Sequence, residues 1–92
     1  MTYTVYEYDA VTCAGEPIQP PTERRVGQAT GAAVQLGGET IYVAIVADAD
    51  MYLRISAAGD AASAADHKLL AGETYGFPVK RLARPYIYGV AA

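Results

Sequence analysis

Residues 40–56, TIYVAIVADADMYLRIS, carry the pattern that most constrains the fold of this chain. Apolar residues occupy every second position from Ile41 to Ala47 and again from Met51 to Ile55. Because successive side chains of a strand point to opposite faces, this period of two predicts two strands that are each buried on one face. The residues between them, Asp48-Ala49-Asp50, are typical of a polar turn that joins antiparallel neighbours. The pattern predicts a β-sheet domain and specifies no chemistry.

Short segments elsewhere repeat this β character. Residues 2–8, 34–36, 75–79 and 86–90 are strand-like, and Gly and Pro turns separate them. About seven short strands predict an all-β fold, a small antiparallel β-sandwich or barrel, with residues 1–92 as a single domain. Pro78 places its segment at a sheet edge or a bulge. The Ala-rich residues 57–66 predict a loop, with at most one short helix near 61–68.

The proline-containing N-terminal segment is predicted to be irregular. Three prolines within residues 13–22 fix φ and remove backbone donors, so this stretch cannot be a central strand. We expect residues 13–25 to form an extended loop or arm, and the sequence leaves open whether it folds back or lies on a neighbouring subunit. Loops of this length in a small domain usually have a function.

The aromatic composition favours a contact with another chain. Eight Tyr occur beside one Phe and no Trp, and Tyr combines a large ring with a polar tip that suits protein interfaces. Arg24 and Arg25 follow the proline segment and offer planar donors for an interface rim. Replacing both by Ala is expected to weaken assembly without changing the fold. The predicted interface comprises Tyr6, Tyr8, Pro17, Pro20, Pro21, Arg24 and Arg25.

Other residues offer no chemical site. The net charge of −3 and the small basic cluster Lys80, Arg81 and Arg84 give no footprint for nucleic acid, and no run of about 18 apolar residues suggests a membrane span. Cys13 is interpreted as a buried small hydrophobe and His67 as a solvent-facing loop residue. We therefore expect no enzyme, no catalytic residue, no metal ligand and no cofactor.

The acidic residues near the central turn leave one alternative open. Asp48 and Asp50 are interpreted as turn residues because Asp carboxylates accept hydrogen bonds from nearby backbone N–H groups. Calcium binding is the alternative, but the spacing does not match an EF-hand loop, which needs alternate acids, a central Gly and a distal Glu.

The segment from Thr40 to Ala92 carries a family resemblance. It reads IYVAIVADADMYLRISAAGDAASAADHKLLAGETYGFPV and then PYIYGVAA. This segment resembles the small β-rich virion proteins of tailed bacteriophages in the order of its parts. An apolar strand, an acidic turn and a second strand are followed by a small-residue loop, Ala-Asp with an apolar pair, Ala-Gly with an acid, and an aromatic strand. The proline-containing segment carries no such resemblance, and LARPYIYG stands where that family often has a Gly-containing polar turn.

The resemblance implies a structural role in the virion. It implies a capsid decoration or head-accessory protein that is assembled in the bacterial host cytoplasm. Its partners would be the major capsid protein and other virion proteins, with a homo-oligomer, most simply a trimer, as the bound form. A tail or head-fibre base subunit is the alternative of the same class. A carbohydrate- or host-factor-binding module is the alternative of another class.

Overall fold

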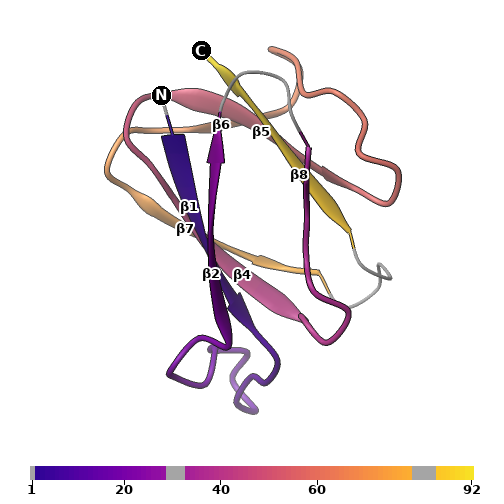
Figure 1. Cartoon of the computed structure of the whole chain (residues 1–92). Coiled ribbons are helices and arrows are strands. Elements are labelled where there is room, and N and C mark those ends of the chain that lie inside the picture. Colours follow the sequence, from indigo (N-terminus) through magenta and orange to yellow (C-terminus); the bar gives the residue numbers. More distant parts are fainter. Residues whose placement is uncertain (1, 29–32, 80–84) are drawn as a thin grey trace.

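The computed structural model describes residues 2–28, 33–79 and 85–92, in which eight strands form two sheets that face each other (Figure 1). The basic cluster at 80–84 lies outside the described residues. Within them there is no helix, and the all-β sandwich predicted from the sequence is confirmed. The strands are β1 (Thr2–Tyr8), β2 (Glu23–Gln28), β3 (Val34–Gln35), β4 (Tyr42–Ala47), β5 (Met51–Ser56), β6 (His67–Leu69), β7 (Thr74–Pro78) and β8 (Tyr86–Ala91).

The two sheets are antiparallel throughout. One has the strand order β2-β1-β4-β7 and the other the order β3-β8-β5-β6. The strands β4 and β5 therefore lie in different sheets, and the predicted hairpin between them is wrong. The alternating pattern is the same for two strands that pair and for two strands that face each other across a core. The carboxylates of the turn hold other segments: Asp48 accepts from Thr2, and Asp50 from the Ala71 N–H at 2.9 Å.

The inward positions of both sheets form one apolar core. On β1 the alternation buries Tyr3 and Val5, and β4 contributes Val43 and Ile45 from the same face. The facing sheet contributes inward residues of β5, β6 and β8. The fully or nearly fully buried apolar residues of the core cluster are Tyr3, Val5, Leu36, Val43, Ile45, Ala47, Met51, Leu53, Leu69, Val79 and Ile87.

Strand β7 is an edge strand, as Pro78 predicted. The Val79 N–H donates to the Ile41 carbonyl at 2.9 Å, so backbone groups at this position face β4. Successive residues of a strand face alternate sides, and the nitrogen of Pro78 therefore points away from β4. Its missing N–H costs no ladder hydrogen bond, and it removes a donor from the open edge at this position.

The Ala-rich segment is a loop that contains no helix. Ser56 Oγ accepts hydrogen bonds from the N–H groups of Gly59 and Asp60 at 3.1 and 3.0 Å, which turns the chain away from β5. A second turn follows, in which Asp66 N–H donates to the Ser63 carbonyl at 3.0 Å. The chain then enters β6 at His67, so this residue lies on a strand and not in the predicted loop.

The proline-containing segment is shorter than the sequence suggested. Residues 23–25 belong to β2, which pairs with β1 rung by rung, so the irregular part ends at Thr22. This part folds back on its own sheet: Thr22 N–H donates to the Glu7 carbonyl at 2.8 Å, and Ile18 N–H to the Ala10 carbonyl at 3.0 Å. Cys13 is exposed in this loop, contrary to its interpretation as a buried residue, because the loop projects beyond the end of the sandwich (Figure 1).

Candidate functional site

The predicted interface residues occupy three different environments. Tyr6 of β1 and Arg24 of β2 are directly paired and therefore share the outer face of their sheet. Arg25 has the opposite parity and points into the sandwich. Tyr8 and the three prolines of the predicted set belong to the folded-back loop or lie beneath it. The structure therefore brings together only part of the predicted set.

The outer face of the β2-β1-β4-β7 sheet is apolar and aromatic. Directly paired residues place Val26, Thr4 and Val46 in one row, and Arg24, Tyr6 and Ala44 in the next. Val26 is 52% exposed, the largest exposed fraction among the large apolar residues of the described chain. Of the described strand residues on this face, Arg24 alone is charged. We call these six residues the outer apolar face.

The loop protects one end of this face. Tyr8 is only 5% exposed, and its ring meets that of Tyr42 edge-on with centroids 6.1 Å apart. Gln19 Nε2 donates to the Tyr8 hydroxyl at 3.2 Å, and this bond ties the loop to the sheet. Pro17 is half-buried and bridges Val11, Pro20 is exposed and Pro21 is half-buried. Tyr8 is thus a packing residue within the chain, whereas Val11 and Ile18 are the large apolar side chains that the loop exposes.

A buried carboxylate organises the other side of the same two strands. Glu7 is fully buried, and its carboxylate pairs with the Arg25 guanidinium across β1 and β2. Its Oε1 also accepts from the Thr40 hydroxyl at 2.6 Å and from the Gly37 N–H at 2.8 Å. The Nη2 atom of Arg25 lies 3.2 Å from Oε2 of Glu23. These contacts join β1, β2 and the turn before β4, so the Glu7 cluster is structural.

The sequence contained one sign of the Glu7 cluster that the sequence-based prediction did not use. Glu7 shares the parity of Tyr3 and Val5 in β1, which placed a carboxylate on the face that must be buried. A buried carboxylate needs a charged or hydrogen-bonding partner. The identity of that partner depends on the pairing of β1 with β2, which the pattern did not reveal because residues 23–25 were assigned to the loop.

Tyr3 spans the core between the sheets. An added Cβ at Gly27, its partner in β2, would overlap the Tyr3 ring, and one at Gly89 in the facing sheet would come within 2.8 Å of it. Both positions lack a side chain because the ring occupies that space. Burial raises the pKa of the Tyr3 hydroxyl to about 12, since the phenolate would lose its hydration. Among the described residues, this hydroxyl has no hydrogen-bond partner.

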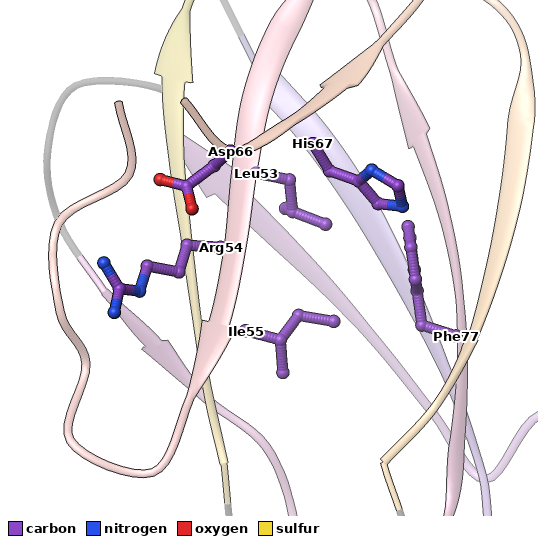
Figure 2. A pocket seen from close by; sticks show the side chains of 6 residues that line it. All are labelled: Leu53, Arg54, Ile55, Asp66, His67 and Phe77. Carbon is purple, nitrogen blue, oxygen red and sulfur yellow. The ribbon is translucent and has the colours of Figure 1, made fainter. Parts of the chain in front are cut away.

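The β3-β8-β5-β6 sheet has a groove at its β6 edge. Figure 2 shows Leu53 and Ile55 of β5, His67 of β6 and Phe77 of β7 converging on one side of β5, with Arg54 and Asp66 on the other. The cavity has a volume of about 410 Å³. The rings of His67 and Phe77 lie 5.3 Å apart and form one wall. Neither residue was predicted to line a site, because β6 was not recognised as a strand.

Within the described part of the chain, no three His, Cys, Asp or Glu residues gather in a way that could hold a metal ion. The carboxylates of Asp48 and Asp50 accept hydrogen bonds from the backbone N–H groups of Thr2 and Ala71, which belong to other segments and not to the turn itself. The described residues also contain no helix that is long and apolar enough to cross a membrane.

Comparison with known proteins identifies no relative. No family model matches the chain, and neither a curated protein nor a solved structure matches it significantly. The assignment of a function therefore depends on the resemblance noted in the sequence and on the surfaces described above.

Proposed function

We propose that this chain is a structural component of a tailed-phage virion, a decoration or head-accessory protein that binds the capsid shell and neighbouring subunits. The observation that carries the proposal is the outer apolar face. This sheet surface carries Tyr6 on an inner strand and a single charged residue, Arg24, which is the charge-poor composition of an interface core. The resemblance of residues 40–92 to small β-rich virion proteins supplies the class of partner.

The proposed binding mode follows from the size of the chain. A domain of 92 residues can offer only a limited contact area to a shell. A homo-oligomer, most simply a trimer, would present several copies of the outer apolar face at once. Multiple weak contacts then act together through their effective concentration, so the oligomer is held more tightly than a single copy.

Purified virions test this proposal. We expect intact particles of the phage that encodes the chain to carry it at hundreds of copies, measured by quantitative mass analysis, whereas a tail or fibre-base subunit would be present at tens or fewer. Val26→Asp should lower its occupancy on particles, because it places a charge on the outer apolar face. Lys68→Glu, an exposed change on the opposite sheet, is the matched control. Particles without the chain would refute the proposal.

A second function has one feature in its favour. The outer face of the other sheet carries Tyr52 and Tyr88 on neighbouring strands, with Arg54 directly opposite Tyr88. Half-buried rings on an outer face beside a guanidinium suit stacking on a sugar, so a carbohydrate- or host-factor-binding module is the alternative. A glycan array probed with the intact protein distinguishes the two, because a reproducible ligand that is lost in Tyr88→Ser would favour the alternative.

A further inference from the structure

One edge of the β3-β8-β5-β6 sheet is incomplete. Strand β6 pairs with β5 over three rungs, the last of which joins Leu53 to His67. Strand β5 continues to Ser56, held on its other side by β8. In the described part of the chain, the second half of β5 therefore has a neighbour on one side only, and Figure 1 shows β6 as a short strand at this edge.

The direction of the backbone groups follows from the ladder to β8. Ala92 N–H donates to the Asp50 carbonyl at 3.1 Å, so the backbone groups of Asp50 face β8. The backbone groups of successive residues in a strand face alternate sides. The backbone groups of Arg54 therefore also face β8, and the backbone groups of Leu53 and Ile55 face β6. Leu53 pairs with His67 of β6. The N–H and C=O of Ile55 open onto the unpaired edge.

The chain's own loop does not fill this position. Continued pairing of β6 with β5 would bring Ala65 opposite Ile55. Instead, the Ser63 N–H donates to Asp66 Oδ2 at 2.8 Å, and this turn carries residue 65 away from the edge. At the other end of the loop, the bonds to Ser56 Oγ start the departure from β5.

The groove lies directly beneath this open edge. Leu53 and Ile55 point into it from β5, and the rings of His67 and Phe77 close its far side (Figure 2). Arg54 and Asp66 lie at its outer rim. We call the open edge at Ile55 and the groove beneath it the notch.

We propose that the notch binds an extended segment of another protein, which adds a strand to β5 in line with β6. The backbone of that segment would form a rung with Ile55, which needs one donor and one acceptor at ladder spacing. Directly paired residues share a face, so the side chain opposite Ile55 would enter the groove and should be apolar. This inference does not depend on the proposed virion role.

The other open edge of the groove is less suitable. A strand added to β7 beside Phe77 would meet the open backbone positions of Gly76 and Pro78, and Pro78 lacks the N–H that the second rung needs. Strand β5 has no proline at Ile55 and offers both backbone groups. The added strand is therefore assigned to β5 and not to β7.

Selection with a random heptapeptide display library on the intact protein tests the proposal, followed by synthesis of the enriched peptide. We expect a peptide with an apolar residue at its centre. N-methylation of the amides that face β5 should weaken binding at least about tenfold, and N-methylation of the alternate amides should not. Exchange of the Ile55 amide, fast in the free protein, should slow at least about tenfold in the complex. His67→Ala should weaken binding, whereas Lys68→Ala, which faces the outer side of the same strand, should not.

Three results would overturn the proposal. The first is a selection that enriches no peptide. The second is a peptide whose affinity does not depend on which set of amides is methylated, because a side chain alone would then occupy the groove. The third is an Ile55 amide that is already protected in the free protein, which would show that the loop itself completes the edge. None of these results bears on particle occupancy, so the proposed function is tested separately.

Discussion

Replacing Arg25 by Ala should destabilise the isolated domain, whereas the same change at the neighbouring Arg24 should not. The sequence alone treated the two arginines as equivalent rim residues and predicted that their joint removal leaves the fold intact. The structure contradicts that premise, because Arg25 pairs with the fully buried carboxylate of Glu7. Arg24 faces outward beside Tyr6.

The expected magnitude follows from what each substitution leaves behind. Removing one partner of a buried ion pair typically costs about 3–5 kcal/mol, because the other charge stays buried without compensation. The Arg25 side chain is 30% exposed, and Glu7 keeps its hydrogen bonds from Gly37 and Thr40, so we expect a loss of about 2–4 kcal/mol. A domain of 92 residues has a free energy of unfolding of about 5–14 kcal/mol in total. The loss corresponds to a fall in Tm of roughly 10–25 °C.

Urea and thermal unfolding of the isolated protein, followed by circular dichroism, measure both variants. Arg24→Ala should lie within about 0.5 kcal/mol of the parent. Adding Glu7→Gln to Arg25→Ala should recover part of the loss, since a neutral amide needs no cation. Equal stabilities of the two arginine variants, or no recovery in the double variant, would refute the assignment of Glu7 and Arg25 as a coupled pair.

Three further core substitutions should change the free energy of unfolding, which urea unfolding measures in each case. Tyr3→Phe removes an unpartnered buried hydroxyl and should stabilise the domain by about 1 kcal/mol at pH 7. The pKa of Tyr3 is about 12 in the native state, whereas in the unfolded chain it is near 10. The free energy of unfolding of the parent should therefore fall by about 2–3 kcal/mol as the pH rises from 10 to 12. Tyr3→Phe should lack this fall. Thr40→Val removes a donor to buried Glu7 and should cost about 1–3 kcal/mol. Gly27→Ala forces a methyl group onto the Tyr3 ring and should cost about 1–3 kcal/mol, whereas no loss would show that the ring moves freely.

The fold class was predictable because it depends on local periodicity. The period of two in β1, β4 and β5 decides which side chains are buried whatever strand lies alongside, and these predictions were confirmed. The partner of each strand was less accessible. A turn as short as residues 48–50 serves both a hairpin and a crossing between sheets, so the local signal could not separate them.

The candidate sites depend on pairing and were correspondingly harder to predict. His67 and Phe77 are ten residues apart, and they line one groove because β6 and β7 lie at the same side of opposite sheets. The Glu7 cluster requires the register of β1 with β2 and the position of the turn at Gly37. No single segment of the sequence encodes either arrangement.

Strand parity in β2 decides which substitutions can report on assembly. Tyr6, Arg24 and Val26 lie on the outer apolar face, so changing them alters a surface that the isolated fold does not use for its core. Arg25, one residue away, holds the Glu7 carboxylate, and a change there would lower particle occupancy by unfolding the subunit. A loss of assembly in an Arg24 and Arg25 double variant therefore could not be assigned to an interface. Val26→Asp and Arg24→Ala, each with an unchanged Tm, are the variants whose loss of occupancy would identify one.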